Sequence, residues 1–253
     1  MIDQSVLARL HLSAVLQNLE EIVVYDDEAG KLVQNWTHTL QFSCPGDIAC
    51  HIEFGQGKCR VVPGATTMPT IGLWFPSAQS LNNMFTGNGK ALPIPWMGVW
   101  HIGLLKGFDT LSKRLEFYLQ PSEETLKNRD HFKFHVQALL YTSLFGVKEV
   151  AENDPKAKPF LKGVRDGILE FRIIDGPAAH VIVKDGKLYP NKGGAINPSC
   201  VMELSDIDSA YGLFTGSLDA MALIGSGQMR MTGFIPLADK INAALDRLPL
   251  YLN

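Results

Sequence analysis

Two histidines, His51 and His180, are the residues best suited to acid–base chemistry, because they match in a sequence that repeats after 129 residues. Histidine titrates near neutral pH and often serves as a general base. A hydrolase, for example one that cleaves acyl thioesters, would also need a nucleophile. No matched Ser, Cys or acidic residue lies near either histidine in the sequence. A structural role is therefore the favoured interpretation, and thioester hydrolysis is the weaker alternative.

Residue types that bind metals or cofactors lack the spacing that such sites require. Lys58 and Lys187 also match, but each follows a turn glycine, which is typical of a solvated turn residue. The glycine-rich segments 191–194 and 225–227 do not have the spacing of phosphate-binding loops. The four cysteines show no CxxC pair and no metal-ligand spacing, which favours buried free thiols in a reducing compartment. We therefore expect no catalytic residue, no metal site and no cofactor.

An offset of 129 residues lays the second half of the chain over the first. It holds from Leu40 to Gly98, which falls on Gly227. The register then slips by three residues, so that Gly107 falls on Gly233. The matched residues are mainly glycine, proline and apolar types, which set turns and cores. The period is too long for a solenoid repeat and suits two tandem domains. We place these domains at 1–125 and 126–253.

Each copy shows the same series of expected elements. In each of the following pairs, the first range lies in the first copy and the second range in the second copy. Helices are expected at 5–22 and 131–152, and again at 107–119 and 236–248. Strands are expected at 37–43 and 167–173, and at 49–54 and 178–183. A glycine turn after the second strand predicts a β-hairpin, and a short helix starts at Ser77 or Asp206 and ends at Gly87 or Gly216. The order is helix, three strands, helix, strand, helix, which predicts an α+β domain with a mostly antiparallel sheet.

The second copy resembles the sterol carrier protein 2 (SCP2) family over residues 168–248. The resemblance rests on the Asp185-Gly186-Lys187 turn, Pro198 before a strand, the helix that ends in Phe214-Thr215-Gly216, the segment Gly227–Gly233, and the helix that Phe234 to Leu237 open. The first copy looks like a diverged member, because its segment 92–106 is longer and more aromatic.

This resemblance implies two tandem SCP2-like domains, each a five-stranded sheet packed against helices, with an apolar tunnel between the layers. Members of the family bind sterols, fatty acids, fatty acyl-CoA or phospholipids without a shared catalytic mechanism. The terminal helices 107–119 and 236–248 are the candidate lids. The implied function is a non-enzymatic lipid-binding carrier. An interaction module with filled pockets, in lipid or quinone metabolism, is the alternative.

Large, flexible side chains are the candidates for the tunnel wall, since methionine in particular adapts to variable acyl chains. In the second copy they are Met202, Leu204, Leu213, Phe214, Met221, Leu223, Met229, Met231, Phe234 and Leu237. In the first copy they are Trp74, Phe85, Trp96, Trp100 and Phe108, whose aromatic bulk could either line or fill the tunnel. Any one of these residues could instead be an ordinary core residue.

Charge and hydropathy argue against some classes of partner and against some cellular locations. The net charge is −3 and no basic stripe is present, which argues against nucleic acid as a partner. The N-terminal segment lacks the pattern of a signal peptide, no apolar stretch reaches membrane-spanning length, and residues 250–253 lack a peroxisomal signal. We expect a cytoplasmic protein that binds a lipid or acyl-CoA.

Overall fold

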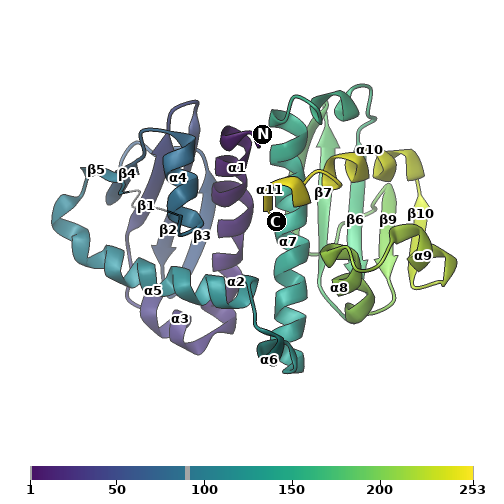
Figure 1. Ribbon diagram of the computed structural model, residues 1–253, viewed down its shortest axis with the longest axis horizontal. Helices are drawn as coiled ribbons and strands as arrows, with labels where there is room; N and C mark the ends of the chain where they lie inside the picture. Colours follow the sequence, from purple (N-terminus) through teal and green to yellow (C-terminus); the bar gives the residue numbers. More distant parts are fainter. Residues whose placement is uncertain (1, 89–91, 253) are drawn as a thin grey trace. The chain divides into compact units, whose positions relative to one another are not determined.

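The chain forms two compact units, Met1–Phe117 and Tyr118–Asn253. The computed structural model describes residues 2–88 and 92–252. Each unit contains its own five-stranded sheet and its own helices (Figure 1). The domain boundary expected at 125/126 stays a prediction.

The first unit begins with helices, continues with four strands, and then alternates helix and strand. Its elements are α1 (Gln4–Leu10), η1 (His11–Val15), η2 (Leu16–Asn18), α2 (Leu19–Tyr25), α3 (Asp27–Val33), β1 (Thr39–Cys44), β2 (Ile48–Gly55), β3 (Lys58–Pro63), β4 (Ile71–Trp74), α4 (Ala78–Phe85), β5 (Ile94–Met97), η3 (Val99–His101) and α5 (Ile102–Leu119). The helix expected at 5–22 is a helical run interrupted by a π-type and a 3₁₀ segment.

The second unit repeats this series after a longer first helix. Its elements are α6 (Glu123–Leu126), α7 (Arg129–Asn153), η4 (Lys158–Leu161), β6 (Gly167–Ile173), β7 (Ala178–Lys184), β8 (Lys187–Lys192), β9 (Cys200–Leu204), α8 (Ile207–Thr215), α9 (Ala220–Gly225), β10 (Met229–Gly233), α10 (Ile235–Leu245) and α11 (Pro249–Leu252). The helices expected at 107–119 and 236–248 correspond to α5 and α10, which begin earlier than expected.

The two sheets have the same strand order. It is β3-β2-β1-β4-β5 in the first unit and β8-β7-β6-β9-β10 in the second. In each sheet one pair is parallel, β1 with β4 or β6 with β9, and the other pairs are antiparallel. The expected α+β class with mostly antiparallel five-stranded sheets is therefore confirmed. The expected count of three strands before the short helix is wrong, because four strands precede it in each unit, β1 to β4 and β6 to β9.

The turns and helix starts that the glycine and polar residues predicted are present in both units. The hairpin turns place Gly57 and Gly186 at φ 70°, a left-handed conformation that glycine adopts without strain. Ser77 caps α4 by accepting a hydrogen bond from the Ser80 amide, and Asp206 caps α8 through the Ser209 amide. These local signals explain why the two halves follow the same path.

The expected matches of Gly98 with Gly227 and of Gly107 with Gly233 are both wrong, since Gly107 lies inside α5 and Gly233 ends β10. A Cβ on Gly98 would lie 1.9 Å from the Thr70 carbonyl oxygen, and one on Gly233 would lie 2.3 Å from the Ser199 carbonyl oxygen. Thr70 and Ser199 are themselves separated by the 129-residue offset. Gly98 is therefore the counterpart of Gly233, and α9 occupies the extra length of the second unit before β10.

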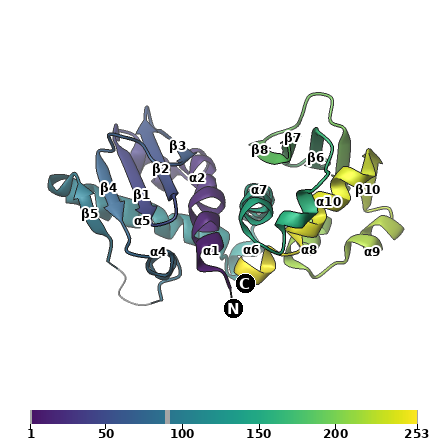
Figure 2. The same cartoon turned by 90° about the horizontal axis from the view of Figure 1, so that it is seen from above.

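Side chains alternate across the first sheet, so one face is apolar and covered by helices. Leu40 and Phe42 on β1 and Leu73 on β4 are buried on that face. Helices α1, α4 and α5 lie over the same side of the sheet (Figures 1 and 2). This arrangement puts the apolar space of the first unit between β1, β2, β4 and the helices.

Candidate functional site

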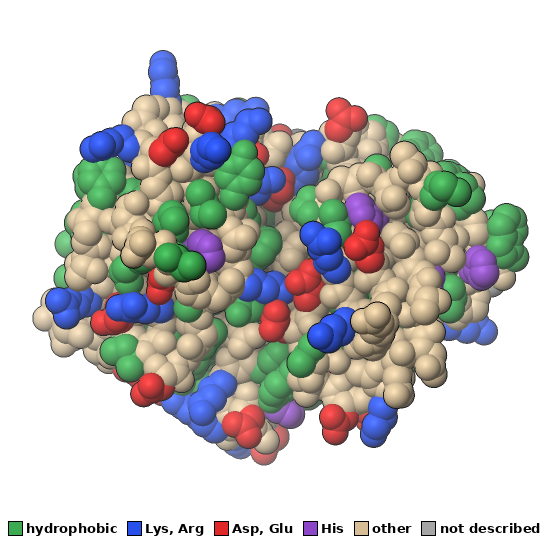
Figure 3. Space-filling model, turned by 180° about the vertical axis from the view of Figure 1, so that it is seen from behind, with side chains coloured by type: hydrophobic (Ala, Val, Ile, Leu, Met, Phe, Trp, Pro, Cys, Tyr) green, Lys and Arg blue, Asp and Glu red, His purple; other side chains and the backbone are tan. Residues whose placement is uncertain are grey.

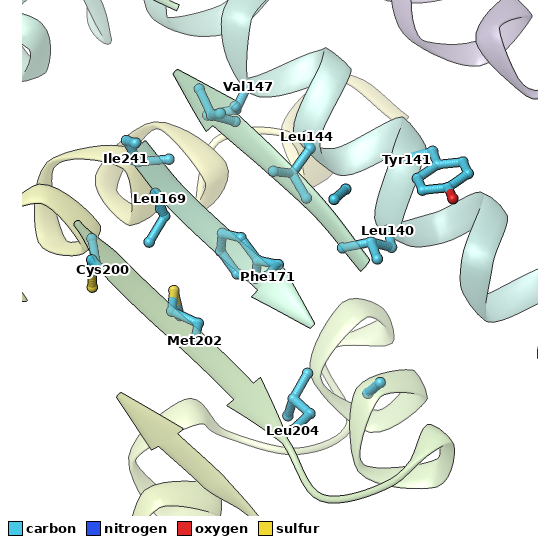
Figure 4. Packing of buried hydrophobic residues seen from close by; sticks show 14 of the residues in the cluster. Leu140, Tyr141, Leu144, Val147, Leu169, Phe171, Cys200, Met202, Leu204 and Ile241 are labelled. Carbon is cyan, nitrogen blue, oxygen red and sulfur yellow. The ribbon is translucent and has the colours of Figure 1, made fainter. Parts of the chain in front are cut away.

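The core of the second unit contains half of the residues expected to line its tunnel. Figure 4 shows Leu140 and Leu144 of α7, Phe171 of β6, and Met202 and Leu204 of β9 as members of one buried cluster. The candidates that lie within this buried cluster are Met202, Leu204, Leu223, Met229 and Leu237. Each of these five is at most 3% exposed. They form a closed layer between the sheet and helices α7, α9 and α10.

A second group of candidates packs at the edge of this core. Its partly buried members are Leu213, Phe214, Met231 and Phe234. Met231 lies opposite Met202 in the antiparallel pair of β10 and β9, and Met229 lies opposite Leu204. Because residues two apart on a strand share a face, the three methionines and Leu204 form one apolar strip. The structure therefore brings most of the second-unit candidates together.

Helix α9 carries apolar side chains that the core does not cover. Met221 is 74% exposed, and Ile224 is also exposed. Leu218, which the sequence reading missed, lies over Gly212, since a Cβ on Gly212 would meet its side chain at 2.4 Å. The only signal for Leu218 was its apolar type in a turn. These residues form an apolar rim beside the buried Leu223.

In the first unit the aromatic candidates divide into two groups. Phe85 and Phe108 both lie beside Phe42, with ring centroids at 6.1 and 5.5 Å, so they belong to the helix-covered face. Phe85 also stacks on the His11 ring at 5.0 Å. Burial lowers the pKa of His11 to about 4, against a smaller opposite effect of its hydrogen bond with Asn82. His11 is therefore neutral at physiological pH and acts as a packing residue.

The tryptophan candidates lie elsewhere. Trp74 alternates with the buried Leu73 on β4 and so faces the opposite side of the sheet. Trp96 is on that side too, because its indole ring takes the space where a Cβ of Gly72 would be. Trp100 is 76% exposed. The structure does not bring these three residues together with Phe85 and Phe108.

An apolar crevice that the sequence reading missed lies on the helix-covered face of the first unit. It lies between β1, β2, β4 and helix α5. Its lining residues are Trp36, His38, Leu40, Phe54, Ile71, Leu104, Leu105 and Phe108. The gaps between these side chains are narrower than a water molecule. Of these lining residues, only Phe108 was among the predicted tunnel residues. Trp36 and His38 were missed because they line the crevice only where α5 packs against the sheet.

The matched histidines make the same contact in the two units. Nδ1 of His51 lies 2.9 Å from the Gly64 carbonyl oxygen, and Nδ1 of His180 lies 2.9 Å from that of Gly193. Since a carbonyl oxygen only accepts, Nδ1 carries the proton in both rings. Each histidine thus fixes the loop that follows the hairpin, and neither is hydrogen-bonded to a serine or cysteine side chain in the described ranges.

Within residues 2–88 and 92–252, no three His, Cys, Asp or Glu side chains gather closely enough to hold a metal ion. The four cysteines are free thiols. Of the helices described, none combines the length and the apolar character needed to cross a bilayer. Lys, Arg, Asp and Glu side chains are intermingled on the face shown in Figure 3.

Comparison with known proteins gives one family match. Residues 147–246 match the model of the SCP-2 sterol transfer family. No curated protein matches the chain. Among solved structures, the sterol carrier protein domain 2 of Helicoverpa armigera is 20% identical with a TM-score of 0.35, over 46% of this chain and 91% of that one.

Two other solved structures are similar at lower identity. The UbiJ-SCP2 ubiquinone synthesis protein is 16% identical with a TM-score of 0.32, over 47% of this chain and 96% of that one. The sec-alkylsulfatase Pisa1 from Pseudomonas sp. is 12% identical with a TM-score of 0.28, over 56% of this chain and 28% of that one.

Proposed function

We propose that the second unit is a non-enzymatic lipid carrier, because residues 147–246 match the model of the SCP-2 sterol transfer family. Its ligand is a lipid with a long apolar part: a fatty acid, an acyl-CoA, a sterol-like molecule or a phospholipid. The single observation that carries the proposal is this family match, which spans all five strands of the second sheet and helices α8 to α10. The carrier works in the cytoplasm, where its free thiols stay reduced.

The proposed ligand space lies between the sheet and helices α8, α9 and α10. The strip of Met202, Met229 and Met231 provides flexible side chains that can rearrange around an acyl chain. Leu237 on α10 lies directly over the start of β6, since a Cβ on Gly167 would be 3.2 Å from its Cδ2 atom. Movement of α10 away from β6 would open the closed layer to a ligand, so α10 is the proposed lid.

Affinity in such a site comes from burial of the chain. Each methylene group that leaves water contributes about 0.8 kcal/mol, so no catalytic or charged group is required. The matched loop contacts of His51 and His180 support a structural role for both rings and weigh against thioester hydrolysis. The candidate binding residues of the second unit are those of the buried strip and of the apolar rim on α9.

The test is native mass spectrometry of the purified chain, followed by titration with saturated fatty acids of increasing length. The expected result is a co-purified lipid and an affinity that rises roughly fourfold for each added methylene. A chain that carries no lipid, and whose affinity does not depend on acyl length, would contradict the proposal. A thioesterase assay with acyl-CoA substrates checks the absence of catalysis.

A second candidate function is an interaction module with filled pockets, in lipid or quinone metabolism. The close packing of Met202, Leu204 and Met229, each at most 3% exposed, favours it. The two candidates differ in the titration, because a filled core does not bind added fatty acid.

A further inference from the structure

The face of the first sheet that points away from its helices is apolar on the side of β4 and β5. Strand β5 is the edge strand there (Figure 1). Trp74 and Ile94 lie opposite each other in the pair of β4 and β5, and both side chains are exposed. Trp96 lies against β4 on the same face, because a Cβ on Gly72 would clash with its indole ring. This side of the sheet therefore presents two aromatic rings and an aliphatic side chain to solvent.

Exposed apolar side chains continue along the chain on both sides of β5. Leu92 precedes the strand, and Val99 and Trp100 follow it in the short helix η3. All three are exposed. A single exposed apolar residue is ordinary, but a group of large ones usually marks a contact surface. We call this group the aromatic edge, and its members are Trp74, Leu92, Ile94, Trp96, Val99 and Trp100.

The second unit shows that the fold does not require apolar residues at these positions. The 129-residue offset places Trp74 on Glu203, and the pair of Trp74 with Ile94 corresponds to the pair of Glu203 with Arg230 in β9 and β10. Glu203 also accepts a hydrogen bond from Arg172 at 2.7 Å. Charged cross-strand neighbours of this kind are typical of a sheet face that is in contact with water. The first unit thus has an apolar pair where its counterpart has a charged one.

The charge of the surrounding chain is of one sign. Between Glu53 and Asp109 the sequence contains no acidic residue. Lys106 is exposed on α5, which follows the aromatic edge. Lys58 and Arg60 are exposed on β3, at the opposite edge of the sheet, where Arg60 pairs with Glu53. The aromatic edge therefore lies in a part of the chain that is basic as well as apolar.

This combination fits a lipid bilayer better than a second copy of the chain. Tryptophan concentrates at the boundary between membrane and water, where its ring is in apolar surroundings and its N–H stays wet. Basic side chains are attracted to anionic head groups. Two copies that met through this surface would bring like charges together, which opposes a symmetric dimer. Pro95 also lacks the amide hydrogen that pairing along the β5 edge would use.

We propose that the aromatic edge docks the protein on the surface of an anionic phospholipid bilayer. Trp74, Trp96 and Trp100 enter the head-group region, and Lys106 lies near the lipid phosphates. The double-sided demand for apolar and basic side chains explains why the first unit differs here from the second. The docking surface belongs to the first unit and does not depend on lipid binding by the second.

The test measures co-sedimentation of the full chain with vesicles of phosphatidylcholine, with and without phosphatidylglycerol. Binding is expected to be stronger to the anionic vesicles and to weaken as the salt concentration rises. Acyl chains that carry bromine should quench the emission of the bound protein, since three of the four tryptophans belong to the aromatic edge. Absence of binding, or equal binding to both vesicles without salt dependence, would overturn the proposal.

A double variant, Trp74→Glu with Ile94→Arg, provides the second measurement. It installs the charged pair of the second unit at the matching positions and leaves the net charge unchanged, so the sheet is expected to fold. Its affinity for anionic vesicles should fall at least about tenfold, because two apolar side chains are removed from the contact. Ile196→Ala removes an exposed apolar side chain from the second unit and should leave the affinity unchanged. Undiminished vesicle binding by the folded double variant would contradict the assignment.

Two further readouts separate this docking surface from other roles. The double variant should bind palmitate as the unmodified chain does, and Met231→Glu should bind vesicles as the unmodified chain does, so this proposal and the carrier proposal fail separately. Analytical ultracentrifugation tests the second copy as the occupant. A dimer of the unmodified chain that the double variant breaks would assign the aromatic edge to self-association and would overturn the membrane assignment.

Discussion

His51 and His180 hold equivalent loops by the same bond, with Nδ1 of each ring 2.9 Å from the carbonyl oxygen of a glycine thirteen residues further on. The two glycines, Gly64 and Gly193, both have positive φ angles, 98° and 82°. Each histidine therefore has the same structural role in its unit, which is to hold a loop whose glycine is in a left-handed conformation.

Replacement of either histidine by alanine is expected to lower the free energy of unfolding by about 1 kcal/mol, the usual net contribution of one hydrogen bond. Urea unfolding of His51→Ala and His180→Ala measures this loss. Acyl-CoA hydrolysis by the two variants should equal that of the unmodified chain. Loss of a measurable hydrolase activity in a fully folded variant would favour the catalytic interpretation instead.

Met231→Glu is expected to reduce fatty-acid affinity at least about tenfold, because an unpaired carboxylate would be placed in the apolar strip of the second unit. Isothermal titration with palmitate measures the affinity, and circular dichroism checks that the fold is intact. Met68→Glu is the matched control, since Met68 is 85% exposed in the first unit. Unchanged affinity in folded Met231→Glu protein would argue against a ligand site at this position.

Asp154 joins the end of α7 to the C-terminal segment of the second unit. Its carboxylate accepts hydrogen bonds from Arg247 at 2.7 Å and from the Tyr251 hydroxyl at 3.0 Å. Asp154→Asn is expected to cost about 3 kcal/mol of stability, because Arg247 would lose its partner in a largely buried site. Asp208→Asn breaks the exposed ion pair with Arg129 and should cost about 1 kcal/mol or less, measured in the same denaturation series.

The same carboxylate predicts a pH dependence. Burial raises the pKa of Asp154, but the hydrogen bonds from the Lys156 amide, Arg247 and Tyr251 outweigh it and hold the pKa below its usual value. A folded-state pKa below the unfolded one stabilises the protein above about pH 4, and this stabilisation is lost as the pH falls through the folded pKa. Stability curves of the unmodified chain and of Asp154→Asn should therefore converge in acid. Curves that stay parallel down to pH 2 would contradict this assignment.

Gly98 and Gly233 are expected to tolerate replacement by alanine less well than Gly227. Alanine at either position would bring a Cβ atom within 2.3 Å of a backbone oxygen, at a φ angle of 71° or 91°. Gly227→Ala is the control, because φ is 76° there and nothing lies within 4 Å of the added atom. It should cost about 1–2 kcal/mol, and the other two clearly more, by thermal unfolding. Equal costs at Gly98 and Gly227 would restore the match that the 129-residue offset suggested.

Tryptophan emission is expected to stay nearly unchanged when the second unit binds lipid. All four tryptophans, Trp36, Trp74, Trp96 and Trp100, precede residue 101. Palmitate should therefore bind, as seen by calorimetry, with almost no change in emission. A saturable blue shift at two palmitate molecules per chain would instead place a fatty-acid site in the first unit.

The repeated order of elements, the hairpins, the helix caps and the resemblance of the second copy to the SCP2 family could all be inferred from the sequence. These features depend on residues close together along the chain. Gly57 and Gly186 set a left-handed turn locally, and Ser77 and Asp206 cap a helix through an amide three residues away. Local signals of this kind survive in a single sequence because no distant partner is needed to interpret them.

The tertiary structure alone decided which apolar residues share a space. Leu73 and Trp74 are neighbours in the sequence, yet the alternation of β4 sends one beneath the helices and the other to the opposite face. Nε2 of His38 is buried without a hydrogen-bond partner among the described residues, in a crevice that the distant helix α5 helps to line. Burial of a side chain depends on which distant element covers its face of the sheet. Composition and residue spacing do not predict that contact.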